Sequence, residues 1–287
     1  METLANLRSA FKDQLSSSYD EEEIRQLFQL LCLEYLQIPK IQIPLRLHEH
    51  ILEPQLKIML QALQELTQGK PIQHILGKAP FYGMDFRVNE HTLIPRPETE
   101  ELVDLILKQH STKIPLKLID IGTGSGCIAI SLKKHLAHSQ LIAVDISADA
   151  IAVAKDNAKS LGADVEFRCL DILEWDLTLW NEQFDVIVSN PPYITQQEKL
   201  NMHRNVLDFE PDSALFVEDE HPLLFYDVIS SFAQQQLKRN GILYFEVNQY
   251  LAEETKVLLL KKGFQHVEVI QDINHAARMI KAWDLML

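Results

Sequence analysis

The chain has 287 residues, which is more than one domain of ordinary size needs, so we expect one large unit and one small unit. Hydrophobic residues make up 46% of the chain and charged residues 24%, which excludes an intrinsically disordered protein. The formal net charge of −14 makes nucleic acid a less favoured substrate without excluding it, because phosphate binding usually requires a basic surface.

The chain lacks the signals of a membrane, disulfide-linked or metal-binding protein. No apolar stretch approaches the ~18 residues of a membrane span, and the first residues lack the order of a secretory signal, so we expect a cytoplasmic protein. The cysteines Cys32, Cys127 and Cys169 are far apart, which predicts neither disulfides nor a zinc site. The run His48-Glu49-His50 has no third ligand nearby, and no metal site is predicted.

Residues 1–75 carry apolar residues at helical spacing and are predicted to form a small helical bundle. The predicted stripes are Leu4, Leu7, Phe11 and Leu15; Ile24, Leu27, Phe28 and Leu31; and Leu56, Met59, Leu60 and Leu63. Asp20 and Glu23 form a capping pair before the second stripe, and Pro54 lies in the first turn of the third helix. The stripes by themselves indicate only a bundle core, so a role of this domain in substrate docking needs other support.

The period of apolar residues changes after the helical region. From Phe81 to Val88 the period is two, which predicts a strand pair, and residues 76–97 are expected to form a β-hairpin linker. In residues 98–287, apolar strands alternate with helical stretches; the strands are 116–121, 141–145, 165–169, 184–189 and 242–246. This alternation favours an α/β fold, a doubly wound parallel sheet with helices on both faces.

The first of these strands leads into a glycine-rich loop, Gly122-Thr123-Gly124-Ser125-Gly126. The dinucleotide-binding fingerprint would place its third glycine at Cys127, so the pattern differs from that fingerprint. The next two strands end at Asp145 and at Asp171-Ile172. At the carboxyl ends of parallel strands, an adenosine would place its ribose on Asp145, its exocyclic amine on Asp171 and its ring against Ile172. A solvated strand-end aspartate is the alternative for Asp145 taken alone.

The strand 184–189 is followed by Asn190-Pro191-Pro192-Tyr193. Proline has no N–H to donate, so this segment offers hydrogen-bond acceptors. The Asn190 side-chain oxygen and the Pro191 carbonyl can each accept one N–H of an NH₂ group, which raises the electron density on its nitrogen. Tyr193 can stack on a flat amide or base. A rigid turn is the alternative for this tetrapeptide taken alone.

Together the glycine loop, Asp145 and the tetrapeptide resemble the class I S-adenosylmethionine-dependent methyltransferases that methylate amino groups. Within that class, further segments are similar to motifs of the release factor glutamine methyltransferases: Phe81-Tyr82-Gly83 through Phe86, Leu93-Ile94-Pro95-Arg96-Pro97-Glu98-Thr99-Glu100, Glu210-Pro211, Ala214-Leu215, Leu224 and Tyr226. The resemblance covers nearly the whole chain. It departs from the family near His221 and near His275, where the family often has glycine.

The resemblance implies a Rossmann-like, mainly parallel sheet of seven strands and the cofactor S-adenosylmethionine. The implied cofactor-binding residues are Gly122, Thr123, Gly124, Ser125, Gly126, Asp145, Asp171, Ile172 and Asn190; the implied catalytic residues are Asn190, Pro191 and Tyr193, with Pro192 joining them in substrate binding. The implied reaction methylates the side-chain nitrogen of the glutamine in the Gly-Gly-Gln motif of class I peptide chain release factors. We further expect a monomer without stable nucleic-acid or membrane binding, whose residues 1–75 grip the release factor.

Two other classes of function stay open. A DNA or RNA amino-methyltransferase would share the tetrapeptide at 190–193 but should also have a basic groove, and none is evident. A non-catalytic module that binds the cofactor or a translation factor would be expected to have lost the glycine loop or the tetrapeptide, and both are intact.

Overall fold

The computed structural model describes residues 2–110, 113–177, 182–199 and 207–286. The chain divides into two compact units: a smaller one that ends at Gly77, apart from a short later segment ending at Phe209, and a larger one that begins at Lys78. Within the described ranges, no helix is long and apolar enough to cross a membrane. Each unit has hydrophobic clusters of its own.

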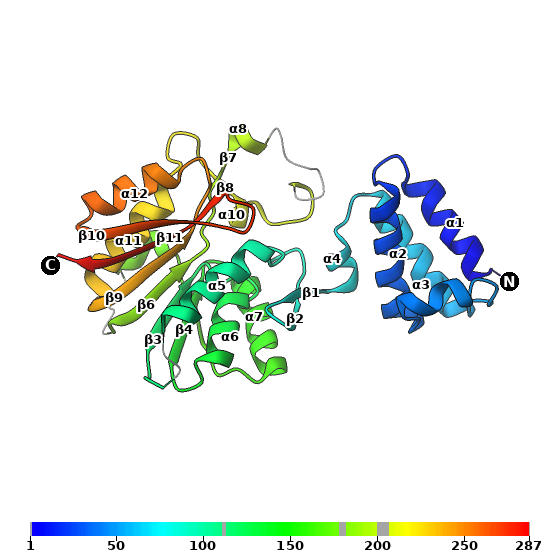
Figure 1. Ribbon diagram of the computed structural model, residues 1–287, viewed down its shortest axis with the longest axis horizontal. Helices are drawn as coiled ribbons and strands as arrows, with labels where there is room; N and C mark the ends of the chain where they lie inside the picture. Colours follow the sequence, from blue (N-terminus) through cyan, green and yellow to red (C-terminus); the bar gives the residue numbers. More distant parts are fainter. Residues whose placement is uncertain (1, 111–112, 178–181, 200–206, 287) are drawn as a thin grey trace. The chain divides into compact units, whose positions relative to one another are not determined.

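The smaller unit is helical, as predicted. Its elements are α1 (Leu4–Leu15), α2 (Glu21–Leu36), the 3-10 helix η1 (Lys40–Leu45), α3 (Glu53–Thr67) and α4 (Ile72–Leu76) (Figure 1). All residues of the first two predicted stripes are buried, and the Asp20 side chain caps α2 by accepting a hydrogen bond from the Glu23 N–H at 2.8 Å. In α3, however, Leu60 is 44% exposed. The buried face runs through Met59, Leu63 and Leu66, and Leu60 lies one residue off that face.

The larger unit is built around a sheet of seven strands, which confirms the predicted fold class. The strands are β3 (Lys117–Ile121), β4 (Gln140–Asp145), β5 (Glu166–Cys169), β6 (Phe184–Ser189), β9 (Leu237–Glu246), β10 (Phe264–Gln271) and β11 (Ala277–Leu285). Their order across the sheet is β10-β11-β9-β6-β3-β4-β5. The strands from β9 to β5 pair in parallel, whereas β11 runs antiparallel to both of its neighbours.

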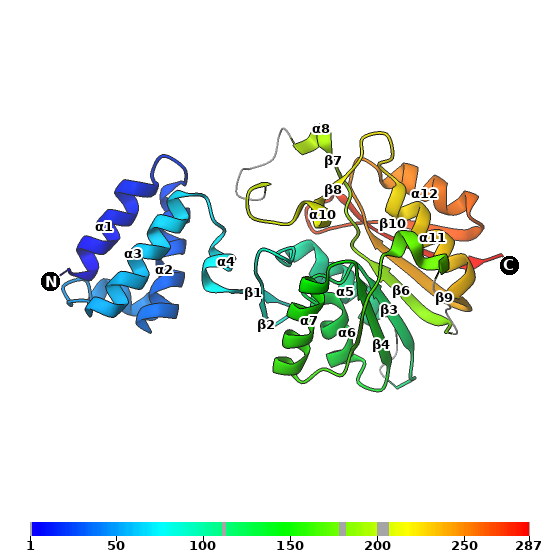
Figure 2. The ribbon, with the colours of Figure 1, turned by 180° about the vertical axis from the view of Figure 1, so that it is seen from behind.

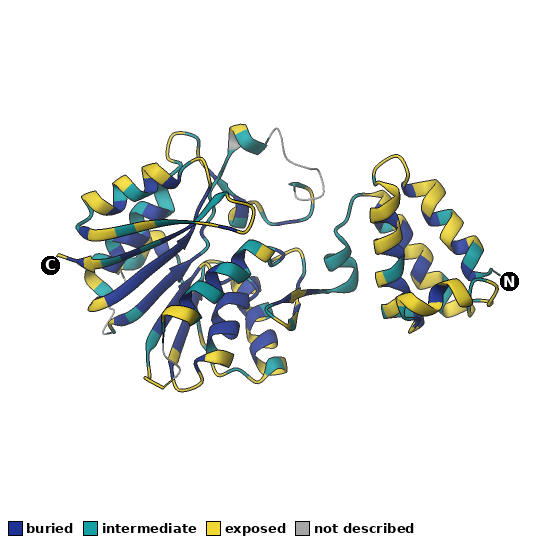
Figure 3. Cartoon of the chain, in the orientation of Figure 1, coloured by how far each residue is buried: buried dark blue, intermediate teal, exposed yellow. Residues whose placement is uncertain are grey.

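Helices cover both faces of this sheet. The helices α5 (Pro97–Gln109), α6 (Cys127–His135) and α7 (Ala148–Leu161) lie on one face; α11 (Leu224–Gln236), α12 (Ala252–Lys261) and the 3-10 helix η2 (Ile172–Leu177) lie on the other (Figure 1 and, from behind, Figure 2). Successive strand residues alternate between the two cores: Leu118 and Tyr244 pack on the first face, Ile119 and Leu243 on the second. Burial on both faces explains why the central strands β3, β4 and β6 are nearly continuous apolar runs (Figure 3).

The remaining elements of the larger unit are short. They are the strands β1 (Lys78–Phe81), β2 (Met84–Arg87), β7 (Ile194–Thr195) and β8 (Phe216–Val217) and the helices α8 (Gln196–Lys199) and α10 (Asp212–Leu215). Strands β1 and β2 form the predicted hairpin, in which Phe81 pairs with Met84. The two turn residues, Tyr82 and Gly83, have φ of 47° and 75°, the left-handed values that match the twist of a two-residue hairpin.

Near His275, where the family often has glycine, the backbone of this chain has an unusual conformation. His275, in the turn between β10 and β11, has a φ of 62°, a left-handed conformation that glycine adopts more readily. Its N–H donates to the Asp272 carbonyl at 2.9 Å, and the Asp272 side chain accepts from the N–H groups of Asn274 and Ala276. These hydrogen bonds hold the turn without a glycine.

Candidate active site

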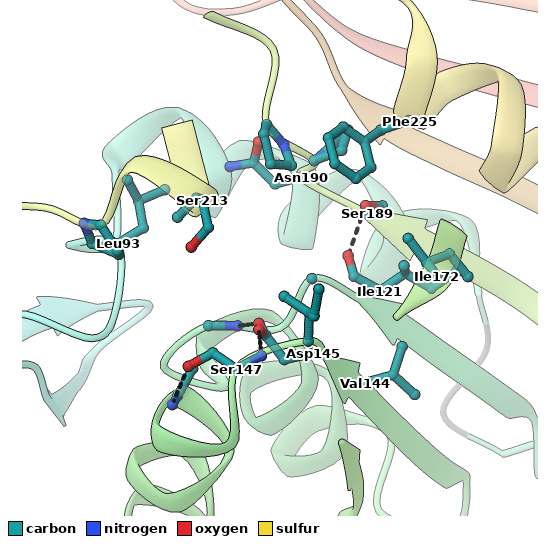
Figure 4. A pocket seen from close by; sticks show the side chains of 18 of the residues that line it. Leu93, Ile121, Val144, Asp145, Ser147, Ile172, Ser189, Asn190, Ser213 and Phe225 are labelled. Carbon is teal, nitrogen blue, oxygen red and sulfur yellow. Dashed lines mark hydrogen bonds between the residues drawn. The ribbon is translucent and has the colours of Figure 1, made fainter. Parts of the chain in front are cut away.

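A cavity of about 260 Å³ lies at the carboxyl ends of β3, β4, β5 and β6 (Figure 4). The order of the strands reverses here, since β4 follows β3 on one side and β6 lies on the other, and such a switch point is where α/β proteins bind ligands. The strand ends bring Gly122, Asp145, Asp171 and Asn190 to the same cavity.

The predicted site residues divide into those that line this cavity and those that do not. Lining it are Gly122, Gly124, Asp145, Asp171, Ile172, Asn190, Pro191 and Pro192. The other predicted residues, Thr123, Ser125, Gly126 and Tyr193, are absent from its lining. Sequence reasoning missed the contribution of Ser213 and Phe225, which extend the wall (Figure 4). The sequence marks these two residues only by their position, since Ser213 and Phe225 each lie next to a segment that resembles a family motif.

The glycine loop is fixed tightly against its neighbours. The N–H groups of Gly122 and Thr123 both donate to the Val144 carbonyl, at 2.9 and 3.0 Å. Gly126 has a φ of 81°, and a Cβ there would lie 2.9 Å from the Ile130 Cδ1 atom and 3.2 Å from the Ala154 Cβ atom. Gly126 therefore shapes the loop from behind, because only glycine fits both this φ and this close approach.

Asp145 is held by the loops on either side of it. Its Oδ2 atom accepts from the Gly124 N–H at 2.8 Å, and its Oδ1 atom accepts from the Ser147 N–H at 2.9 Å. Burial raises the pKa of this carboxyl above its usual value, although hydrogen bonds from backbone N–H groups act in the opposite direction. Each carboxylate oxygen can accept further hydrogen bonds, so Asp145 fits a ligand with two neighbouring hydroxyl groups.

Next to Asp145 the wall of the cavity is apolar. Val144, Ile172 and Phe225 line this part (Figure 4). Asp171 also lines the cavity, and its Oδ1 atom accepts from the Leu173 N–H at 2.8 Å. Apolar side chains together with a carboxylate in one cavity suit a flat heterocycle that carries an amino group. The observed residues therefore fit an adenosine.

Asp120 lies beneath the glycine loop and is completely buried. Its Oδ2 atom accepts from the Thr123 hydroxyl at 2.6 Å and from the Ala129 N–H at 3.2 Å, while within the described part of the chain its Oδ1 atom has no partner. Burial raises the pKa of Asp120 to about 7. Thr123 thus binds a buried carboxyl and does not face the cavity.

On the opposite side of the cavity, Asn190 begins a chain of hydrogen bonds. Its Nδ2 atom donates to the Thr99 hydroxyl at 3.3 Å, and this hydroxyl donates to the Glu246 carboxylate at 2.6 Å. The Tyr193 hydroxyl donates to the same carboxylate at 3.2 Å. Burial raises the pKa of both Glu246 and Tyr193. Thr99 lies in the family-like segment 93–100 and Glu246 ends the predicted strand 242–246, but no pattern in the sequence indicates a role for either side chain.

Another buried carboxylate, Glu210, joins two segments that line the cavity. Glu210 is 5% exposed, accepts from the Ile94 N–H at 3.0 Å and pairs with the Arg96 guanidinium. Leu93 and Pro211, the neighbours of these residues, line the cavity. The sequence motifs around positions 94–96 and 210–211 thus meet through one ion pair. In the described residues, no cluster of three or more His, Cys, Asp or Glu side chains could hold a metal ion.

Known proteins similar to this chain are methyltransferases. The family model "PrmC N-terminal domain" matches residues 6–77, and "Methyltransferase small domain" matches residues 99–209. A release factor glutamine methyltransferase of Flavobacterium psychrophilum is 45% identical over 97% of this chain and 98% of its own length. Another, of Bacteroides thetaiotaomicron, is 41% identical over 94% and 96% of the two chains.

Among solved structures, a methyltransferase of Pyrococcus furiosus has a similar fold. It matches with a TM-score of 0.53 at 16% identity and covers 71% of this chain and 91% of its own. At that identity the likeness concerns the fold alone, and it agrees with the methyltransferase domain that the family model matches.

Proposed function

The chain belongs to the release factor glutamine methyltransferase family, and from this premise we propose that it methylates the side-chain nitrogen of the glutamine in the Gly-Gly-Gln motif of class I release factors. The observation that carries the proposal is that Asp145 and the segment Asn190-Pro191 line one cavity. The first suits a nucleoside and the second an NH₂ group, so the cavity can hold both partners of an amino-group methylation.

The methyl donor is S-adenosylmethionine, in keeping with the methyltransferase domain. When bound, it supplies an electrophilic methyl group whose C–S bond breaks as the acceptor nitrogen takes the carbon. We assign the ribose hydroxyls to Asp145, the exocyclic amine to Asp171 and the adenine ring to the apolar wall at Ile172. From the glycine loop, Gly122 and Gly124 line the same cavity.

The chemical difficulty lies in the acceptor, since the lone pair of an amide nitrogen is delocalised into its carbonyl group. In this proposal, the Asn190 Oδ1 atom and the Pro191 carbonyl each accept one N–H of the glutamine side chain. As the nitrogen forms its bond to carbon it becomes more positive, and both hydrogen bonds strengthen. Interactions that strengthen in the transition state are the ones that increase the rate.

No strong base is required before transfer. An N-methylated amide that has gained a positive charge is very acidic and loses its proton once the new N–C bond has formed. The stacking role of Tyr193 stays a prediction. Its side chain is absent from the cavity lining, and its hydroxyl is bound to Glu246.

The names of the relatives and the charge of the chain support a protein substrate. Relatives similar over nearly the whole chain are named for release factors, and the net charge of −14 does not favour a phosphate-binding surface. We further propose that the helices before residue 77 dock the release factor, that the enzyme acts as a monomer in the cytoplasm, and that it does not bind nucleic acid stably.

The decisive experiment offers labelled S-adenosylmethionine to the enzyme with purified release factor, DNA and ribosomal RNA in parallel. Mass spectrometry then locates the methyl group. We expect label on the Gly-Gly-Gln glutamine and none on nucleic acid. A release factor whose motif glutamine is replaced by glutamate is the matched control and should stay unlabelled. Label on DNA or RNA with none on the release factor would instead establish a nucleic-acid methyltransferase.

A further inference from the structure

We infer that Thr99 and Glu246 are positioning residues that determine which way round the Asn190 carboxamide lies. The inference rests on the proposed function and adds to it two side chains that do not line the cavity. Thr99 lies in the first turns of α5, and Glu246 is the last residue of β9. Their side chains meet behind the acceptor segment, with Thr99 3% and Glu246 2% exposed.

The direction of each hydrogen bond follows from the chemistry of the three groups. Burial raises the pKa of Glu246, but the hydrogen bonds from Thr99 and Tyr193 and the charge of Arg278 favour its ionised form. An ionised carboxylate can only accept, so the short contact of 2.6 Å between the Thr99 Oγ1 and Glu246 Oε2 atoms uses the single hydroxyl proton of Thr99. The Thr99 oxygen is left with lone pairs only. It can therefore accept from the amide nitrogen of Asn190, 3.3 Å away, but cannot donate to the amide oxygen.

This order of protons settles the orientation of the carboxamide. With Nδ2 facing Thr99, the Asn190 Oδ1 atom is free to accept an N–H from the substrate. In a reversed carboxamide, the Asn190 Oδ1 atom would face the Thr99 oxygen, which places two acceptors against each other. Its NH₂ group would then face the NH₂ group of the substrate in the cavity, which places two donors against each other. Since Thr99 and Glu246 are buried from water, no solvent molecule relieves that mismatch cheaply.

Glu246 also stabilises the far end of the acceptor segment. Its Oε1 atom accepts from the Tyr193 hydroxyl at 3.2 Å, while its Oε2 atom acts on Asn190 through Thr99. Asn248, two residues beyond β9, donates from Nδ2 to the Tyr193 carbonyl at 3.3 Å. One buried carboxylate at the end of a central strand thus holds both ends of the segment 190–193 at once.

The test replaces Thr99 by valine, which has nearly the same shape but offers no oxygen. We expect Thr99→Val to lower kcat for release factor roughly 10- to 100-fold. This loss should not exceed the loss caused by removing a group that hydrogen-bonds the transition state directly, because Thr99 acts only through Asn190. The KM for release factor and the affinity for S-adenosylmethionine, measured by calorimetry, should change less than about threefold. Thr99→Ser should restore most of the lost rate, because it restores the hydroxyl.

The matched control is Thr255→Val in α12. Thr255 is also buried, and its hydroxyl donates to the Leu251 carbonyl at 2.8 Å, so this variant loses one buried hydroxyl hydrogen bond outside the cavity lining. It should lower the melting temperature without changing kcat. If both valine variants lose stability and neither loses rate, Thr99 has a structural role only and the inference is wrong.

A second variant covers the possibility that Thr99→Val does not fold. Glu246→Gln keeps the shape of the side chain but gives it an NH₂ group that can donate to Thr99 and so reverse the proton order. We expect Glu246→Gln to lower kcat by a similar factor. The double variant Thr99→Val/Glu246→Gln should lose no more than either single variant, since both changes break the same chain of hydrogen bonds to Asn190. A Glu246→Gln enzyme as fast as wild type would overturn the inference. Failure of the wild-type enzyme to label any release factor would instead overturn the proposed function.

Discussion

Asn190 and Asp145 line the same cavity, yet the chemistry assigned to them predicts opposite kinetic effects. Asn190→Ala should lower kcat about 10²- to 10³-fold and leave S-adenosylmethionine affinity within about threefold, because its hydrogen bond strengthens only in the transition state. Asp145→Ala should mainly weaken cofactor binding, since it loses the carboxylate that holds Gly124 and faces the cavity. Single-turnover methylation and calorimetry separate the two effects. A turnover of Asn190→Ala within a fewfold of wild type would remove Asn190 from the chemistry.

Asp120 should make the stability of the protein depend on pH. Burial raises its pKa to about 7, above the ~3.9 of an unfolded chain. Between these values the folded protein binds more protons than the unfolded one, so this group lowers stability as pH rises, by at most about 1.4 kcal/mol per pH unit.

Asp120→Asn removes this titration. The free energy of unfolding of the variant, relative to wild type, should therefore increase as pH rises from about 5.5 to about 7 and level off above that. Urea unfolding of both proteins across this range measures the difference. Parallel stability curves would show that Asp120 does not titrate there. Any change in the hydrogen bonds to Thr123 and Ala129 adds only a constant offset.

Single residues of the site were predictable where a local pattern marks them. Asp145, Asp171 and Asn190 each follow an apolar strand, so their place at one edge of a parallel sheet followed from the fold class. The hydrogen bond between Thr99 and Glu246 could not be predicted in this way. These two residues lie 147 positions apart, and neither has a neighbour in sequence that indicates a buried hydrogen bond.

At the scale of elements, helix α7 connects the β1–β2 hairpin to the glycine loop through one buried side chain. The Asn157 Oδ1 atom accepts from the Arg87 N–H at 2.7 Å, and its Nδ2 atom donates to the carbonyls of Arg87 and Ser125 at 3.0 and 2.9 Å. We expect Asn157→Ala to lower the free energy of unfolding by about 2–4 kcal/mol, because it leaves backbone groups unpaired. Cofactor affinity should fall too, since Ser125 belongs to the glycine loop.

Asp156 offers the matched control on the same helix. Its carboxylate pairs with the same residue, Arg87, at 3.7 Å, but both side chains are about two-thirds exposed. Asp156→Ala should therefore change the free energy of unfolding by less than about 0.5 kcal/mol and leave cofactor affinity unchanged. Urea unfolding and calorimetry compare the two variants. Equal effects would mean that Asn157 contributes no more than a surface residue does.

Within the large sheet, apolar runs in the sequence located the strands of the parallel part. Strands β3, β4 and β6 are nearly uninterrupted apolar runs, and each was predicted to within one residue of its observed bounds. Of β9 (Leu237–Glu246), only the apolar half at 242–246 was predicted, because polar residues occupy most of its first half. Strands β10 and β11 followed only from the resemblance, because exposed polar residues interrupt β10, as in Phe264–Gln271, and no strong apolar run remains. The prediction for Leu60 was wrong for another reason, since a leucine can lie beside the buried stripe of a helix without belonging to it.

At the scale of the whole molecule, each unit has a core of its own. The cluster of the smaller unit lies within residues 4–76, and the clusters of the larger unit lie within residues 79–285. The cavity is lined entirely by residues of the larger unit. The proposed chemistry therefore needs only the larger unit, and the smaller one is free to serve recognition.

This division predicts that a chain lacking residues 1–77 keeps its chemistry but loses its efficiency on the natural substrate. Cofactor affinity and the rate on a short Gly-Gly-Gln peptide should stay within about threefold of the full-length values, whereas kcat/KM for intact release factor should fall at least about tenfold, because a tethered second contact raises the effective concentration of the glutamine. The peptide is the control, since it cannot engage a docking domain. Methylation of intact release factor at the full-length rate would show that residues 1–77 do not dock it. If the shortened chain does not unfold cooperatively, an isolated fragment of residues 1–77 decides the matter: in excess it should inhibit methylation of intact release factor and leave methylation of the peptide unchanged.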